Sequence, residues 1–313
     1  MALKHSLVSR LGLGTAPLGN LFSAVTDEDA AATVAAAWQQ GIRYFDTAPQ
    51  YGHGLSETRL GAALAEYPRN EYVLASKVGR VLVAPLPGAA RPPSGFVDIP
   101  PVDPVFDFSR DGILRSLHES LERLGVDRLD VVHVHDPDGH EAEALATAFP
   151  TLIELREQGV LGKVGCGMNQ VAMLERFVEQ VDLDCILLAG RYTLLDRSGE
   201  SLLADCASRG VEVIAGGVFN SGLLANPVVG ATFDYSSASP ELVAGAMRLQ
   251  AVCERFGVPL PAAAMQFVAR HPAVTCTLIG ARSVAEIEAD IAYADVEISP
   301  ELWLAMDAAS GDT

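Results

Sequence analysis

The stretch "GIRYFDTAPQYGHGLSETRLGAAL" (41–64) contains a short apolar run, a polar loop and a helical pattern, in that order. The run at 42–46 has the length of a buried strand, and a helix is expected near 56–66. Asp46 stands where the expected strand ends, and Tyr51 lies in the loop behind it. A strand followed by a helix is half of a βαβ unit, so the fold depends on whether this pattern repeats.

The same strand-then-helix pattern occurs eight times along the chain. Strands that alternate with helices imply right-handed βαβ connections and a parallel sheet. Eight units in about 280 residues predict a closed (β/α)8 TIM barrel of the α/β class, forming a single domain over 1–313. The expected strands are 11–15, 42–46, 72–77, 129–135, 162–166, 185–190, 211–216 and 274–280, and the expected helices are 27–40, 56–66, 109–124, 141–158, 170–180, 198–209, 241–256 and 283–292.

A doubly wound dinucleotide-binding sheet would also alternate strands with helices. Its first strand is typically followed by the phosphate-binding pattern G-x-G-x-x-G. The glycine-rich segment "GLGTAPLG" (12–19) does not fit that pattern, so the barrel is the favoured architecture.

Two connections are longer than the others. The proline-rich segment 80–108 follows the third expected strand, and 217–240 follows the seventh. Long loops in compact domains are usually lids or binding loops. Both would lie on the face where the strands end, which carries the active site in barrel enzymes.

Composition excludes several classes of partner. The formal net charge of −18 disfavours nucleic acid and anionic membrane surfaces. No apolar run reaches the roughly 18 residues of a membrane span, and the N-terminal segment lacks the apolar stretch of a signal peptide. The five cysteines form no C-x-x-C pair, which indicates free thiols and a cytoplasmic location. The oligomeric state has no signal in the sequence.

Polar residues gather at the ends of three neighbouring expected strands. Asp46 and Tyr51 follow the second, Lys77 ends the third and His135 ends the fourth. A free phenol has a pKa of about 10, and an ammonium beside it favours the phenolate. We therefore expect Tyr51 to act as a general acid–base tuned by Lys77 and Asp46, with His135 orienting a substrate oxygen.

Three segments in chain order resemble the aldo-keto reductase family: 41–64, "LASKVG" (74–79) and "SLHESLERLGVDRLDVVHVHDPD" (116–138). The resemblance extends over nearly the whole chain. It implies that the four residues above form that family's catalytic tetrad. His133, one layer deeper than His135, is expected to be a packed, hydrogen-bonded core residue, and His53 to lie on the surface.

The resemblance also implies an NAD or NADP cofactor bound without a dinucleotide-binding sheet. Asn169 would hold the nicotinamide carboxamide, and Ser221, Gly222 and Leu224 would line the pyrophosphate. Gly280, Arg282, Ser283 and Asp290 match the adenosine-phosphate segment. Since Arg282 is the single basic residue in 279–290, we expect NAD to be used at least as well as NADP.

The segments "HVHDPD", "AGRYTLLDR" (189–197) and "GGVFNSGLLA" (216–225) resemble one branch of the family. That branch includes D-threo-aldose 1-dehydrogenases, L-fucose dehydrogenases and pyridoxal 4-dehydrogenases. It implies a small-molecule substrate, with oxidation of the anomeric carbon of an L-fucose or D-threo-aldose type sugar to a lactone. Pyridoxal 4-dehydrogenation and general aldehyde or ketone reduction are the alternatives.

Two further classes stay open. His133 and His135 resemble the metal-binding pair of metal-dependent barrel hydrolases, although no histidine ends the fifth or sixth expected strand, where such sites need further ligands. The chain could also be a cofactor-binding sensor that turns over slowly. The intact tetrad argues against that hypothesis, and no metal is expected.

Overall fold

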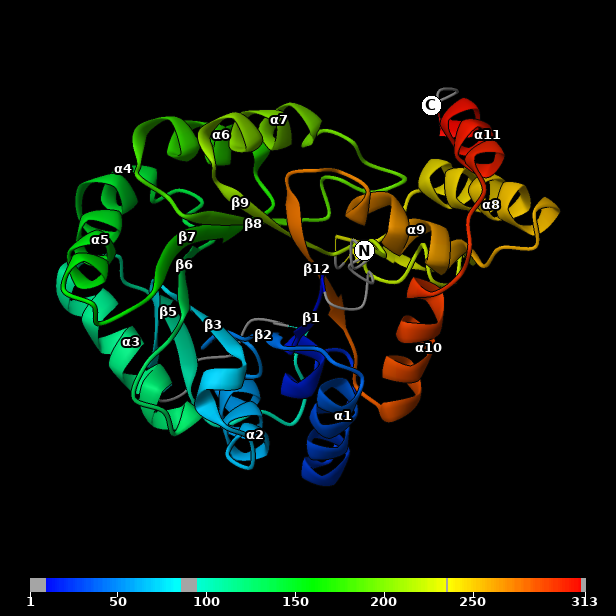
Figure 1. Ribbon diagram of the computed structural model, residues 1–313. Helices are drawn as coiled ribbons and strands as arrows, with labels where there is room; N and C mark the ends of the chain where they lie inside the picture. Colours follow the sequence, from blue (N-terminus) through cyan, green and yellow to red (C-terminus); the bar gives the residue numbers. More distant parts are fainter. Residues whose placement is uncertain (1–9, 86–94, 235, 311–313) are drawn as a thin grey trace, which may run out of the picture.

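Eight parallel strands close into a barrel in the computed structural model, which describes residues 10–85, 95–234 and 236–310 (Figure 1). Around the barrel the strand order is β1, β12, β9, β8, β7, β6, β3 and β2. The predicted (β/α)8 fold is therefore confirmed. The strands are β1 (Leu11–Gly14), β2 (Tyr44–Asp46), β3 (Val73–Val78), β6 (Val131–His135), β7 (Lys163–Met168), β8 (Cys185–Ala189), β9 (Glu212–Gly216) and β12 (Val274–Gly280).

An outer ring of helices covers the strands (Figure 1). Several begin or end with capping residues: the hydroxyl of Thr26 accepts from the Asp29 amide at the first helix, and Gly125 ends the third in a left-handed conformation. Such caps satisfy backbone groups that the helix itself leaves unpaired. The ring contains α1 (Asp27–Gln39), α2 (Leu55–Leu64), α3 (Arg110–Leu124), α5 (Phe149–Glu157), α6 (Val171–Gln180), α7 (Glu200–Arg209), α9 (Leu260–Ala269) and α10 (Val284–Ala294).

The seventh barrel helix differs from the prediction. The segment expected to fill this role is α8 (Pro240–Arg255), but α8 packs with α11 (Pro300–Ser310) in a lobe beside the barrel (Figure 1). The helix that packs on β12 is α9. Its sequence, "LPAAAMQFVA", is apolar on nearly all sides because nine of its ten residues are buried. A helix without a polar face gives no helical periodicity in the sequence.

The two long loops contain short strands. After β3, β4 (Arg80–Val83) pairs antiparallel with β5 (Asp103–Phe106). After β9, β10 (Thr232–Phe233) pairs with β11 (Ser236–Ser237). Strand β6 is followed by α4 (Glu141–Glu143) and a π-helical turn, η4 (Ala144–Ala148), that leads into α5.

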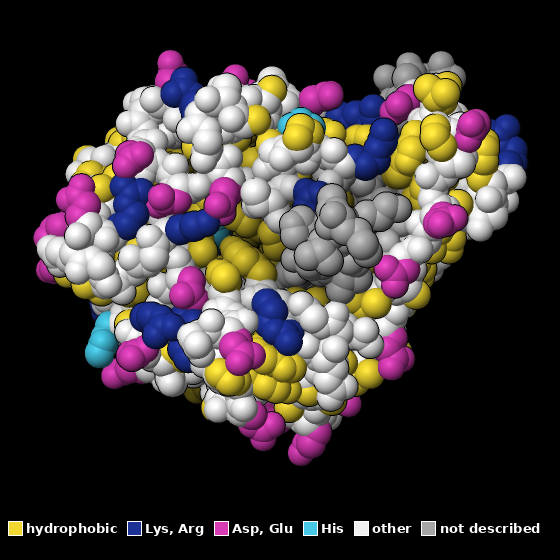
Figure 2. Space-filling model, viewed as in Figure 1, with side chains coloured by type: hydrophobic (Ala, Val, Ile, Leu, Met, Phe, Trp, Pro, Cys, Tyr) yellow, Lys and Arg dark blue, Asp and Glu magenta, His cyan; other side chains and the backbone are white. Residues whose placement is uncertain are grey.

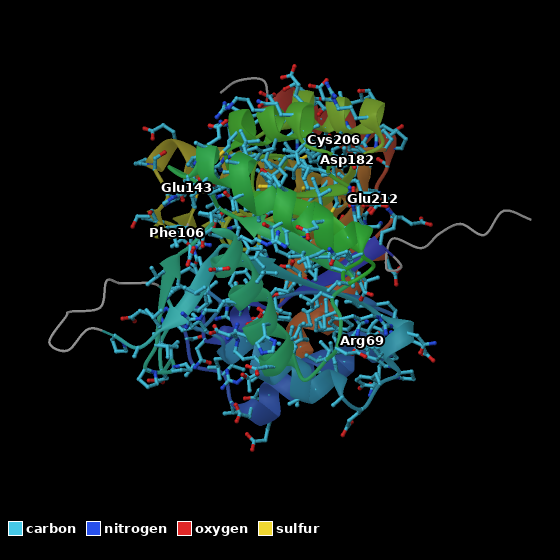
Figure 3. The ribbon with its side chains drawn as sticks, turned by 90° about the vertical axis from the view of Figure 1, so that its left-hand side faces the viewer. Arg69, Phe106, Glu143, Asp182, Cys206 and Glu212 are labelled. Carbon is cyan, nitrogen blue, oxygen red and sulfur yellow. The ribbon has the colours of Figure 1, made fainter. Side chains whose placement is uncertain are left out.

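The side view separates the two ends of the barrel. Phe106 and Glu143, which follow β3 and β6 in the chain, lie on its left, whereas Glu212, at the start of β9, lies on its right (Figure 3). The strands therefore end at the left of this view. The face in front in Figures 1 and 2 is the one where the strands begin, and acidic and basic side chains are interspersed around it (Figure 2). Within the described ranges, no helix has both the length and the apolar character needed to cross a bilayer.

Candidate active site

The barrel register brings Asp46 and Lys77 together at the ends of β2 and β3. Lys77 Nζ donates to Asp46 Oδ1 at 2.5 Å and to the Thr47 carbonyl oxygen at 2.9 Å. The two charged side chains are only 2% and 1% exposed. Burial raises the pKa of Asp46, and the Lys77 ammonium opposes that rise. Lys77 therefore has a carboxylate and a carbonyl oxygen as hydrogen-bond partners inside the barrel.

Tyr51 lies over this pair. Lys77 Nζ is 4.7 Å from the centroid of the Tyr51 ring, and the rings of Tyr51 and His135 are 5.8 Å apart and nearly perpendicular. The loop that carries Tyr51 is fixed by a close backbone approach, because a Cβ atom at Gly52 would lie 2.4 Å from the Gly19 carbonyl oxygen. The structure therefore places the four predicted catalytic residues in one cluster.

His135 is buried at the end of β6. Its Nε2 is 3.4 Å from Asp136 Oδ2. Burial lowers the pKa of His135 well below its ordinary value, and the charges of Arg80 and Lys77 act in the same direction. The imidazole is therefore neutral at neutral pH, with one nitrogen able to donate and one able to accept.

His133 lies below His135 in the barrel, as expected, but it is not hydrogen-bonded. Neither ring nitrogen has a partner in the part of the chain that the structure describes. Burial, followed by the Lys77 charge, lowers the pKa of His133 to about 3. A sequence pattern can predict that this residue is buried but not whether a partner reaches it.

His53 is also placed differently from the prediction. It is 5% exposed, and its Nδ1 lies 2.6 Å from the Val102 carbonyl oxygen. Val102 belongs to the loop after β3, which folds back over the start of α2. His53 therefore fixes this loop instead of lying on the surface.

The loop after β3 reaches the tetrad, as its place in the chain predicts. The ring of Phe96 is 6.4 Å from that of Tyr51.

Arg80, the first residue of β4, lies close to His135 through a shared partner, Asp136, and was not predicted as a site residue. Its Nη2 donates to Asp136 Oδ2 at 3.3 Å, and its guanidinium lies 4.5 Å from the centre of the Phe106 ring. The sequence feature that could have indicated Arg80 is its position directly after the lysine segment "LASKVG" (74–79).

The residues expected to bind the nicotinamide half of the cofactor lie on the same face. Asn169 follows β7, and its carbonyl oxygen accepts from Arg191 Nε at 3.1 Å. Residues 220–222 all have positive φ, at 47°, 56° and 95°. Asn220 is the first residue of this run, and its Oδ1 is buried without a hydrogen-bond partner among the described residues. A buried acceptor that lacks a donor fits a ligand with hydroxyl groups, such as a nucleotide.

Leu224 cannot contact the cofactor through its side chain, because that side chain is fully buried in the hydrophobic core. A contact of Leu224 with the pyrophosphate would therefore involve its backbone, and it stays a prediction. The backbone of Leu224 donates to the Phe219 carbonyl oxygen. This hydrogen bond closes the turn that contains Ser221 and Gly222.

The adenosine-phosphate segment spans the end of β12 and the start of α10. Gly280 ends the strand, and the hydroxyl of Ser283 caps the helix by accepting from the Glu286 amide. Arg282 Nε is already paired with Glu286 Oε1 at 3.0 Å, and its Nη1 donates to Ser23 Oγ. Asp290 is 6% exposed, and burial, followed by the Glu286 charge, raises its pKa to about 7.

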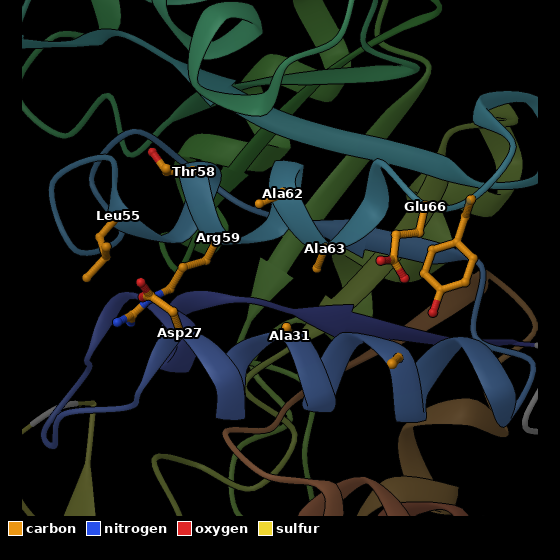
Figure 4. Close-up of a pocket in the computed structure, with 10 residues that line it drawn as sticks. Asp27, Ala31, Leu55, Thr58, Arg59, Ala62, Ala63 and Glu66 are labelled. Carbon is orange, nitrogen blue, oxygen red and sulfur yellow. The ribbon is translucent and has the colours of Figure 1, made fainter.

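Two hollows lie away from the tetrad. A groove of about 290 Å³ runs between α1 and α2 and is lined by Asp27 and Arg59 (Figure 4), which pair at 2.8 Å. A second hollow, of about 330 Å³, lies where the strands begin and is lined by Tyr44, Cys185 and other residues. Barrel chemistry occurs at the opposite face, so we assign none to either hollow. The described ranges contain no cluster of three or more His, Cys, Asp or Glu side chains that could bind a metal.

A tyrosine over a buried lysine–carboxylate pair, beside a neutral histidine, can move a proton to or from a substrate oxygen. The sequence matches the Aldo/keto reductase family over residues 10–310, and the chain belongs to that family. The predicted family is thus confirmed. The chain is an NAD(P)-dependent oxidoreductase.

Individual relatives cover most of the chain. It is 42% identical to D-threo-aldose 1-dehydrogenase from Pseudomonas sp over 95% of this chain and 92% of that protein. It is 41% identical to pyridoxal 4-dehydrogenase from Microbacterium luteolum, again over 95% of this chain and 92% of that protein. Among solved structures, glycerol dehydrogenase from Gluconobacter oxydans is similar with a TM-score of 0.75, at 22% identity over 97% of this chain and 91% of that one. This last likeness shows the fold alone.

Proposed function

We propose that the chain oxidises the anomeric carbon of an aldose, of the L-fucose or D-threo-aldose type, to a lactone. The observation that carries the proposal is the placement of Tyr51 over the buried Lys77–Asp46 pair. A phenolate stabilised by an ammonium is a suitable base for the hydroxyl of a cyclic hemiacetal. The 42% identity to D-threo-aldose 1-dehydrogenase supports the substrate class.

In this mechanism Tyr51, as phenolate, takes the proton of the anomeric hydroxyl. Lys77 stabilises the phenolate, and Asp46 keeps Lys77 charged although both are buried. The neutral His135 donates a hydrogen bond to the reacting oxygen and orients it. A bound nicotinamide supplies the hydride acceptor for C1. The lactone product hydrolyses in water, which favours the oxidative direction.

The cofactor would be held by the segments described above. Asn169 is proposed to bind the carboxamide. Ser221, Gly222 and the backbone of Leu224 are proposed to line the pyrophosphate, and Gly280, Arg282, Ser283 and Asp290 to bind the adenosine end. We propose that NAD is used at least as well as NADP. The pairing of Arg282 with Glu286 supports this, because an NADP site normally directs unpaired basic groups at the 2′-phosphate.

A second candidate function is pyridoxal 4-dehydrogenation, supported by the 41% identity to that enzyme. Pyridoxal also forms a cyclic hemiacetal, so the same four residues would act on it.

A cytoplasmic location is also part of the proposal. The burial of all five cysteines as free thiols is compatible with it.

The test follows reduced-nicotinamide absorbance with NAD and with NADP against L-fucose, D-arabinose, L-galactose and pyridoxal. We expect turnover with at least one aldose, and loss of about two to four decades of kcat in Tyr51→Phe with little change in cofactor affinity. Glu286→Gln should raise the ratio of NADP to NAD efficiency, because it frees Arg282. Near-normal turnover in Tyr51→Phe, or activity on pyridoxal alone, would refute the aldose proposal.

A further inference from the structure

Arg80 is a buried cation beside the tetrad whose hydrogen bonds are incomplete. It is 9% exposed. Its Nη2 donates to Asp136 Oδ2 at 3.3 Å, whereas its Nη1 is buried and has no partner among the residues that the structure describes. A buried donor without an acceptor destabilises the folded protein. Such a group needs an explanation, and a ligand that supplies the acceptor is one.

The surroundings of Arg80 link its guanidinium to the tetrad through one carboxylate. Asp136, its ion-pair partner, lies 3.4 Å from His135 Nε2. The charge of Arg80 acts on both Tyr51 and His135. The ring of Phe106 supports the guanidinium at 4.5 Å. Arg80 is therefore held in place on one side by an aromatic ring and on another by a carboxylate shared with His135.

The pairing of Arg80 with Asp136 suits one kind of group. Guanidinium offers only donors, and an ionised carboxylate offers only acceptors. A hydroxyl can satisfy both at once, because its oxygen accepts from Nη1 while its hydrogen is donated to the carboxylate. A simple alkyl aldehyde carries no second oxygen that could do so.

We propose that Arg80 is a substrate-binding residue that recognises a hydroxyl next to the reacting carbon, such as the 2-hydroxyl of an aldose. This inference rests on the proposed function and narrows its substrate class to α-hydroxy carbonyl compounds and their hemiacetals. Arg80, together with Asp136, then distinguishes sugars from unsubstituted aldehydes.

The experiment compares L-fucose with 2-deoxy-L-fucose in the wild-type enzyme and in Arg80→Met, whose side chain is apolar and of similar length. We expect wild type to prefer L-fucose, and Arg80→Met to lose roughly 10- to 100-fold of kcat/KM on L-fucose, the range for a hydrogen bond to a charged group. The loss of kcat/KM on the deoxy sugar should be clearly smaller, because that sugar offers no 2-hydroxyl to Arg80. Arg80→Lys, which keeps a donor, should recover part of the preference.

Equal losses on both sugars, or no preference for L-fucose in wild type, would overturn the inference. Equal losses with a shifted pH–rate profile would assign Arg80 to tuning Tyr51 and His135 instead. Quenching of protein fluorescence on cofactor binding shows whether Arg80→Met is folded. The preference of the wild-type enzyme for L-fucose tests the inference without any variant. If wild type oxidises pyridoxal but no sugar, the aldose proposal fails. A comparison of lactaldehyde with propionaldehyde, which lacks the α-hydroxyl, then still tests Arg80.

Discussion

At the scale of single residues, the site depends on charges held away from water. Lys77 and Asp46 are almost fully buried and are joined at 2.5 Å. Removal of one partner from a buried pair leaves the other uncompensated, at a cost of about 3–5 kcal/mol. The pair therefore contributes to stability as well as to the proposed chemistry, and variants can separate the two roles.

Lys77→Met should lower the free energy of unfolding by about 3–5 kcal/mol and depress turnover at neutral pH. The double variant Lys77→Met/Asp46→Asn carries no buried charge here, so much of the lost stability should return while activity stays low. Urea unfolding and steady-state kinetics measure the two properties. If the double variant regained activity together with stability, Lys77 would have only a packing role.

Asp290 should make stability depend on pH. Its pKa is raised to about 7 in the folded chain, so the folded state binds a proton that the unfolded chain releases between about pH 4 and 7. Its contribution is favourable below that range and is lost as pH rises through it. Asp290→Asn should therefore be more stable than wild type at pH 8, and this advantage should shrink at pH 5.

The check on Asp290 is a pair of melting temperatures at pH 5 and pH 8, taken without cofactor. Glu288→Gln is the matched control, because Glu288 is an exposed acid on the same helix. An equal change in both variants would mean that Asp290 contributes only general charge.

At the scale of elements, Arg191 joins three loops on the catalytic face. From the loop after β8 it donates to the Asn169 carbonyl oxygen and binds both carboxylate oxygens of Asp234, at 3.1 and 2.5 Å. Asp234 belongs to the long loop after β9, and Asn169 follows β7. The position of the proposed carboxamide ligand is thus linked to the loop that contains the proposed pyrophosphate turn.

Asp234→Asn should loosen this link and raise the cofactor dissociation constant by roughly tenfold, the value of one good charged hydrogen bond. At saturating cofactor, kcat should change little, because the tetrad is untouched. Titration of protein fluorescence with NADH measures the constant. Asp205→Asn, an exposed acid on α7, is the control, and equal binding in both variants would contradict the proposed role of Arg191.

Elements also show where sequence reasoning stops. The strands were predictable because each is a short apolar run followed by a polar end, and parallel closure brings those ends together. Helix α9 was not, because it is apolar nearly all round. The hairpin of β4 and β5 was hidden in a proline-rich segment. Its pairing depends on tertiary contacts that no local pattern records.

At the scale of the whole molecule, the site also contains residues that the sequence could predict and residues that it could not. The tetrad could be predicted because its members follow consecutive strands and therefore converge. His53 and Arg80 could not be placed, because their partners, Val102 and Asp136, are far away in the chain. Pairing of β1 with β12 joins the first and last strands of the barrel and completes the face on which all these loops meet.

The central claim is that hydride leaves the anomeric carbon of an aldose while this barrel holds the reacting oxygen. Incubation with NAD and L-fucose deuterated at C1, followed by mass spectrometry of the reduced cofactor, tests it directly. The account predicts one deuterium in each reduced nicotinamide and formation of the corresponding lactone. Reduced cofactor that carries no deuterium would contradict the claim, because the hydride would then come from another carbon.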